Sequence, residues 1–269
     1  DMSLLLCRQE AVTRPYYVEA LDIHLYSSQE LCYVIYHHPL LVMEEFVDER
    51  LIGFIRDELN MGNLAARLEK GAGGENSDEL LFAILTECFY YTPPEISQYR
   101  QRVASLRKKT PAEFEKERAD YLFSIGQYGK AVQIYETLLE SGNKPEERAD
   151  REFTGKLWNN LGAAYARLFQ TTKAFQAYEK AGEYLGMDEP EREMYFLAEL
   201  NPELRSRLRS SDQEKREAWE REAGEAREKA AQSREILKLE QLLERDPEEG
   251  LEEAAELVKK WKREYRSMV

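Results

Sequence analysis

The chain has 269 residues, and 42% of them are hydrophobic, which is enough to build a buried core without a metal or a disulfide framework. Asp and Glu outnumber Lys and Arg by 52 to 38, so the net charge of −14 disfavours DNA, RNA or an anionic lipid surface as a partner. Cys7, Cys32 and Cys88 form no CxxC pair and leave an odd thiol, and no stretch approaches the roughly 18 apolar residues of a membrane span. These features predict a cytoplasmic protein.

The first region, residues 2–70, is expected to combine a small β-element with helices. Leu21, Ile23 and Leu25 alternate with polar residues at the period of a half-buried strand, which we expect to pair with Ser3–Cys7. Ser27 stands three residues before Glu30, a capping box that predicts a helix ending before Pro39. Two further helices are predicted over 48–59 and 63–70.

Residues 71–77 are the only glycine-rich stretch and are expected to be a linker. They lack the Lys-Ser/Thr ending of a phosphate-binding loop, and no strand precedes them. Helices are predicted to follow over 78–90 and 93–106. Thr92 and Glu95 have the spacing of a cap for the second of these helices.

An internal repeat determines the expected architecture. Residues 155–188 contain W-x-x-L-G-x-x-Y, formed by Trp158, Leu161, Gly162 and Tyr165, followed by Ala174, Tyr178 and Ala181. A weaker copy over 112–145 has Ala119, Leu122, Gly126, Tyr128, Ala131, Tyr135 and Leu138. The small residues allow two helices to approach closely while the aromatic residues fill the space around them, and Trp158 is the expected anchor between the helices.

These two copies resemble the tetratricopeptide repeat (TPR) family. The resemblance implies a mainly α fold, a short TPR-like α-solenoid within a helical domain over 78–210, with flanking helices covering its ends. The nine residues between the copies, 146–154, are expected to extend the first helix of the second repeat. Helices over 190–200 and 202–209 are expected to cap the array.

The tail, residues 211–269, is predicted to be a charged helical extension. Half of its residues are charged, and the part before Ile236 has only Trp219 and alanines as an apolar seam, so we expect an exposed helix there that the core does not need. Leu251, Ala254, Val258, Trp261 and Tyr265 fall on one face of a last helix. That face is expected either to close a helical hairpin or to dock a partner.

The sequence contains no recognisable catalytic or cofactor-binding motif. Its three histidines are His24, His37 and His38, and the adjacent pair cannot clamp one metal ion because neighbouring side chains point apart. Nucleophile elbows, Walker loops and dinucleotide fingerprints are missing. We therefore expect a protein that is not an enzyme and has no cofactor or metal.

The expected function is a protein-binding scaffold or adaptor that holds a peptide or partner protein on the concave face of the repeats. The repeat register predicts that this face carries Lys116, Asp120, Phe123, Lys156, Asn159, Asn160 and Arg167. The cations among them favour an acidic or carboxylate-bearing segment.

Two alternatives stay open. One is a peptide-sensing regulator resembling bacterial TPR receptors, although 11 basic against 17 acidic side chains in residues 1–110 argue against a DNA-binding domain there. The other is a structural subunit of a larger assembly.

Overall fold

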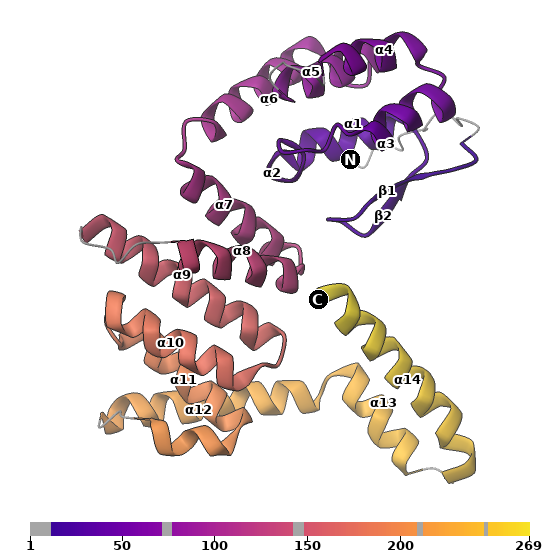
Figure 1. Cartoon of the computed structure of the whole chain (residues 1–269). Helices are drawn as coiled ribbons and strands as arrows, with labels where there is room; N and C mark the ends of the chain where they lie inside the picture. Colours follow the sequence, from indigo (N-terminus) through magenta and orange to yellow (C-terminus); the bar gives the residue numbers. More distant parts are fainter. Residues whose placement is uncertain (1–11, 72–76, 142–147, 209–211, 245–246) are drawn as a thin grey trace. The chain divides into compact units, whose positions relative to one another are not determined.

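In a computed structural model the chain is mainly helical, with one small antiparallel sheet (Figure 1). The structure describes residues 12–71, 77–141, 148–208, 212–244 and 247–269. The chain divides into two compact units, one ending at Arg118 and the other beginning at Ala119. This division falls inside a helix, whereas the sequence placed boundaries at 71–77 and after 210.

The sheet consists of β1 (Tyr16–Val18) and β2 (Ile23–Leu25), and Tyr17 lies opposite His24 in its register. The predicted strand is therefore present, and Leu25 is its most buried side chain. Its expected partner, Ser3–Cys7, lies outside the described residues. β1 was not expected from the sequence.

Most helices of the first unit lie close to the predicted positions. The unit contains α1 (Ser28–His37), α2 (Pro39–Val42), α3 (Glu49–Gly53), the π-helical η1 (Phe54–Glu58), α4 (Gly62–Gly71), α5 (Ser77–Glu87) and α6 (Pro93–Leu106). The short α2 was not predicted, and the helix expected over 48–59 is divided into α3 and a π-helix. The predicted caps are confirmed: the Ser27 hydroxyl accepts a hydrogen bond from the Glu30 amide, and Thr92 and Glu95 form a capping box. Most of the glycine-rich segment between α4 and α5 lies outside the described residues.

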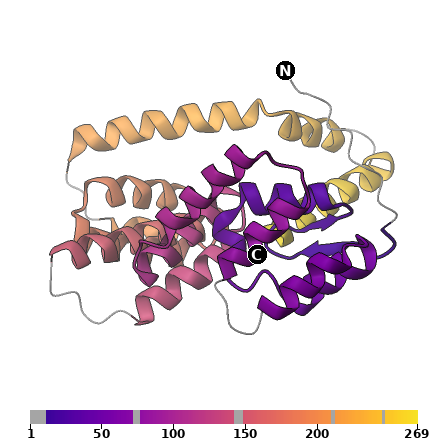
Figure 2. The same ribbon diagram turned by 90° about the horizontal axis from the view of Figure 1, so that it is seen from above.

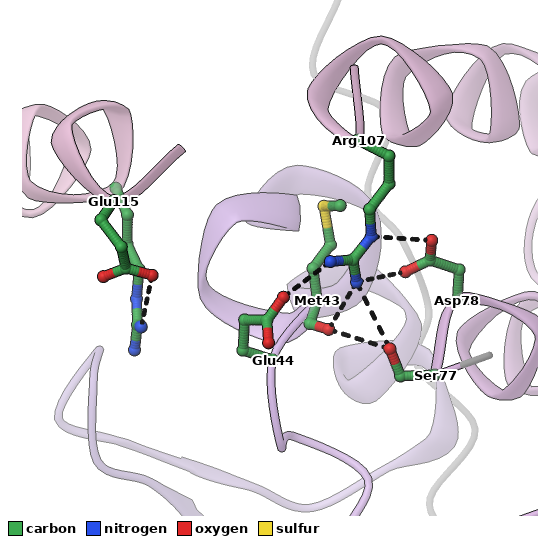
Figure 3. Close-up of polar contacts among 7 residues, drawn as sticks. Met43, Glu44, Ser77, Asp78, Arg107 and Glu115 are labelled. Atoms are coloured by element: carbon green, nitrogen blue, oxygen red, sulfur yellow. Dashed lines mark hydrogen bonds and ion pairs between the residues drawn. The ribbon is translucent and has the colours of Figure 1, made fainter. Parts of the chain in front are cut away.

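Arg107, directly after α6, ties three parts of the first unit together (Figure 3). Its guanidinium binds both carboxylate oxygens of Asp78, at 3.0 and 2.8 Å, and donates to the Met43 carbonyl at 3.0 Å and to Glu44 at 2.7 Å. Asp78 is buried, so its charge needs such a partner. The cluster fixes the start of α5 and the end of α2 against the end of α6.

Four helices form the two copies of the repeat. They are α7 (Pro111–Ser124), which contains the boundary between the units, α8 (Tyr128–Ser141), α9 (Arg148–Arg167) and α10 (Thr171–Leu185). From α8 onward, α8 packs on α9, α9 on α10, and α10 on α11 (Asp188–Leu200) (Figure 1). After α11 comes the 3₁₀ helix η2 (Pro202–Arg207).

Close packing within the second copy follows from its small residues. A Cβ at Gly162 would come within 3.1 Å of the Tyr178 ring, and Ala174 and Ala181 are completely buried. Tyr178 itself is buried, so it is the aromatic that fills the space between α9 and α10. Trp158 is only half-buried, which differs from the expected role as the internal anchor.

The tail forms α12 (Gln213–Ala231), α13 (Arg234–Leu243) and α14 (Pro247–Met268). Most of α12 is exposed, as expected, but its apolar seam is docked on the unit. Trp219 and Ala223 are buried, and the Trp219 ring lies 5.6 Å from the ring of Tyr195 on α11. The seam is narrow, but one tryptophan supplies a large apolar area for docking.

The predicted hairpin of α13 and α14 is present, and the end of α14 returns to the repeat helices (Figures 1 and 2). Gln127, in the turn between α7 and α8, donates to the Ser267 carbonyl at 3.1 Å. The Tyr265 hydroxyl donates to the Leu168 carbonyl, in the turn between α9 and α10, at 3.4 Å. The last helix is thus attached to the turns of both helix pairs.

Candidate functional site

The predicted concave residues separate into several small groups. Lys116 lies on α7 before the unit boundary and is not part of the site described here. Asp120 accepts hydrogen bonds from the Tyr135 hydroxyl at 2.6 Å and from the Asn160 amide at 2.8 Å. Burial and the neighbouring Asp120 carboxylate raise the pKa of Tyr135, so its hydroxyl stays a donor. Asp120 and Asn160 therefore bind each other and join α7, α8 and α9.

Phe123 and Arg167 both lie near Tyr128, the first residue of α8. The Phe123 ring contacts Tyr128 edge-on at 5.1 Å, and the Arg167 guanidinium lies 5.9 Å from the centre of the same Tyr128 ring. Gln127, in the turn between α7 and α8, binds the Ser267 carbonyl near the end of α14. Arg167 is thus placed at a turn beside an aromatic pair.

Lys156 and Asn159 join neither group. Lys156 forms an ion pair with Glu152, one turn earlier on α9, at 2.6 Å. The Asn159 side-chain oxygen is buried and accepts no hydrogen bond from the part of the chain that the structure describes. Asp120, Asn160 and Lys156 thus each have a polar partner within the fold.

A groove of 850 Å³ opens elsewhere in the second unit, between α8, α9, α10 and α11 and beside the end of η2. Its volume falls in the range of ordinary ligand and peptide sites. The apolar residues that line it are Leu139, Trp158, Leu161, Met187, Met194 and Leu208. Since Trp158 is half-buried and Met187 is 41% exposed, apolar side chains remain accessible within the groove.

The rim of this groove carries more acids than bases. Glu136, Glu140, Glu179, Glu183 and Glu191 line it together with Lys173, Lys180 and Arg207. Arg207 pairs with Glu179, and Lys180 pairs with Glu183. The remaining acids therefore leave the groove with a negative charge.

Glu136 is held in place by Tyr165. The Tyr165 hydroxyl donates a hydrogen bond to the Glu136 carboxylate, and burial together with that carboxylate raises the pKa of the tyrosine. The Lys173 ammonium lies 5.2 Å from the centre of the Tyr165 ring. Glu136, Tyr165 and Lys173 therefore form an ordered polar side of the groove.

Most of the groove is not predictable from the sequence. Trp158 and Tyr165 were expected as packing residues of the repeat, whereas Leu139, Met187 and Glu191 were not expected to take part in binding. The spacing of Glu136 and Glu140, one helical turn apart on α8, is the signal that could have indicated a charged wall. Loop residues such as Met187 and Leu208 carry no such signal.

The described residues provide no evident site for metal chemistry. Among them, no three His, Cys, Asp or Glu side chains gather where they could hold a metal ion. The rings of His37 and Tyr33 are tilted by 35° with 4.2 Å between their centres, and burial lowers the pKa of both His37 and His38. Within the described ranges, no helix combines the length and apolarity needed to cross a membrane.

Comparison with protein-family models, with curated proteins and with solved structures gives no match for this chain. The geometry of the second unit is therefore the basis for the function proposed below.

Proposed function

We propose that this chain is a non-catalytic protein-binding scaffold, and that its second unit holds an amphipathic peptide segment in the groove between α8 and η2. The observation that carries the proposal is the half-buried Trp158 in the lining of an 850 Å³ groove whose lining carries more acids than bases. Tryptophan is among the residue types that most often dominate binding energy at protein interfaces.

The charge of the rim favours a segment with cations beside its apolar anchors. Glu140 and Glu191 face the groove, and Glu136 adds a third carboxylate that is hydrogen-bonded by a neutral tyrosine. A segment with Lys or Arg at these points would gain complementary charge, while an acidic segment would be repelled. This differs from the acidic segment expected for the concave face, where Asp120 and Asn160 already bind each other.

A peptide-display selection with the full chain as bait tests the proposal. The matched bait carries Glu140→Lys and Glu191→Lys, which reverse the rim charge at exposed or half-exposed positions and leave the floor intact. We expect peptides selected on the original chain to combine apolar anchors with Lys or Arg, and to bind the charge-reversed chain at least about ten-fold more weakly.

A third bait distinguishes binding in the groove from binding on the predicted concave face. Lys156→Glu changes one of the predicted concave residues and should leave the affinity of the selected peptides unchanged. Peptides that bind the original and the rim-reversed chains equally well, or that lose affinity only with Lys156→Glu, would contradict the groove as the binding site.

A further inference from the structure

The turn between α9 and α10 carries a phenylalanine where the same turn of the first copy carries a glycine. Gly126 and Phe169 stand at the same position of copies that begin at residues 112 and 155. In each turn the amide of this residue donates to the carbonyl three residues earlier at 3.0 Å, and the next amide donates to the carbonyl five residues before itself at 2.9 Å. The φ angle is 84° at Gly126 and 59° at Phe169. Glycine is the usual residue at such a helix end, because a positive φ is costly for a side chain as bulky as phenylalanine.

Packing within the fold does not account for Phe169. Its side chain is 75% exposed, so it buries little apolar area in return for the unfavourable backbone. The end of α14 is attached near this turn by other groups, the Tyr265 hydroxyl on the Leu168 carbonyl at 3.4 Å and the Gln127 amide on the Ser267 carbonyl at 3.1 Å. Backbone strain that packing does not explain is often found at positions that bind a ligand.

Phe169 forms one side of an apolar hollow of 750 Å³, and α14 forms the other side. The apolar residues that α14 contributes are Val258, Trp261, Tyr265 and Met268. Val258 and Tyr265 are 42% and 40% exposed, so solvent reaches these side chains. A hollow of this volume falls in the range of ligand and peptide sites, and a group of exposed large apolar side chains is typical of an interaction surface.

Positive charge flanks the hollow. Lys262 and Arg266 line it and are four residues apart, so they are neighbours on one side of α14. Both are exposed, and neither forms an ion pair with a residue in the described part of the chain. The single acid of the lining, Glu264, pairs with Lys260 at 3.5 Å. The local charge is therefore opposite in sign to the net charge of −14 of the whole chain.

We propose that this hollow binds an acidic peptide segment of a partner protein. One large apolar side chain of the segment lies between Phe169 and Trp261, and its carboxylates bind Lys262 and Arg266. Aromatic side chains and arginine often dominate binding energy at interfaces, and hydrogen bonds between charged groups are the stronger ones. A basic segment would be repelled here. The inference does not depend on the groove between α8 and η2, because no described residue lines both sites.

Labelled peptides that place a Phe, Leu or Trp between pairs of Glu test the hollow by fluorescence anisotropy with the full chain. At least one of these acidic peptides is expected to bind with a dissociation constant in the micromolar range. Matched peptides with Ser in place of the apolar residue should bind at least about ten-fold more weakly, because the aromatic walls then have no anchor to hold. If none of the acidic peptides binds more tightly than about 1 mM, the proposal is wrong.

Phe169→Gly gives the second turn the residue that the first turn already has. Glycine adopts a positive φ without strain, so the melting temperature should stay the same or rise. The affinity for the acidic peptides should nevertheless fall by about ten-fold or more, because one aromatic wall is removed. A variant that binds as tightly as the original chain, or that melts at a clearly lower temperature, would contradict the assignment of Phe169 to binding.

A pair of charge changes on α14 tests the cationic flank. Arg266→Glu should weaken binding of the acidic peptides by about ten-fold or more. Arg263→Glu makes the same charge change at a position that does not line the hollow, and it should weaken binding far less. Trp158→Ala, in the other groove, should leave the affinity unchanged. Equal losses in the two arginine variants would reduce the effect to overall charge, and a loss with Trp158→Ala would place the peptides in the groove; either result overturns the proposal.

Discussion

Glu58 illustrates how a single carboxylate can hold a segment that has little secondary structure of its own. Its carboxylate accepts hydrogen bonds from the backbone amides of Thr13 at 2.8 Å and Arg14 at 3.1 Å. These two bonds lower the pKa of Glu58 to about 2, and the bond from the Arg14 amide has the larger effect. The Arg14 side chain also pairs with Glu58, but it is 83% exposed, so the amides are the stronger cause.

A pH-dependent stability follows for the first unit. Because the folded-state pKa of Glu58 lies below the ordinary value of 4.5, its contribution is present above that value and is lost as the pH falls toward 2. Glu58→Gln should lower the melting temperature at pH 7 and flatten its decline between pH 5 and 2, measured by circular dichroism. Glu140→Gln, in the other unit, is the control; if both variants follow the profile of the original chain, Glu58 does not hold the segment.

The Asp120 cluster shows why a predicted binding residue can instead hold the fold. Asp120 is the acceptor for two donors, Tyr135 and Asn160, on two other helices. Asp120→Ala leaves both donors without their acceptor and should cost about 1–3 kcal/mol of unfolding free energy. Tyr135→Phe removes one bond and should cost about 1 kcal/mol. Urea denaturation measures the loss of unfolding free energy in both variants. If Asp120→Ala loses no more than Tyr135→Phe, Asp120 does not stabilise the fold through both donors.

Trp158 and Tyr178 give opposite expectations although both belong to the repeat motif. Tyr178 is buried against Gly162, whereas Trp158 is half-buried in the groove. Tyr178→Ala should therefore lower the melting temperature more than Trp158→Ala, because it leaves a cavity between two helices. Trp158→Ala should instead reduce the affinity of the peptides selected on the groove. If Trp158→Ala lowers the melting temperature more than Tyr178→Ala, Trp158 is the internal anchor of the repeat.

At the scale of elements, α12 is the clearest case of a helix whose attachment depends on one side chain. Its sequence is dominated by charged residues, yet Trp219 is only 8% exposed and packs on Tyr195. Three ion pairs connect α12 to the region around α11: Arg192 with Glu222, Arg227 with Glu199, and Lys215 with Asp188. Exposed pairs of this kind contribute little individually, so the tryptophan should dominate the attachment.

Trp219→Ala is therefore expected to loosen α12 from α11. Hydrogen exchange should show reduced amide protection in both helices and little change in α9, because the cavity forms at one surface of the unit. Glu225→Ala, at an exposed position on the same helix, is the matched control. Equal protection in the two variants would mean that α12 does not depend on this contact.

At the scale of the whole molecule, the two compact units have separate buried clusters. In the first unit the Arg107 guanidinium donates hydrogen bonds to Asp78, to Glu44 and to the Met43 carbonyl. The second unit has its buried residues around α8 to α11, with Tyr135, Phe175 and Ala181 among the most buried. A change in one cluster should therefore be felt mainly within its own unit.

Arg107→Met tests this separation. It removes the charged partner of the buried Asp78 and should reduce amide protection at the start of α5, the end of α2 and the end of α6. Amides of α9 and α10 should keep their protection in the same hydrogen-exchange experiment. Loss of protection in α9 and α10 as well would show that the two units unfold together.

Most of the helices and their ends are predictable from the sequence alone, because they depend on local chemistry. Ser27 with Glu30, and Thr92 with Glu95, cap helices through contacts between residues three apart, so their spacing is sufficient to predict them. The small and aromatic residues of the second copy likewise predicted two closely packed helices, α9 and α10.

Which side chains are accessible depends on how distant elements pack, and the sequence does not show this packing. Whether Trp158 lies inside the fold or in a groove depends on η2 and Met187, which are distant in sequence from the α8 wall that they face. Asp120 was expected to be available to a ligand, but Asn160, 40 residues later, occupies it. Leu251 and Val258 share one face of α14 in the sequence pattern, but their exposure depends on α13 packing against the face that carries Leu257. Periodicity identifies an apolar face, whereas burial requires knowing which elements meet it.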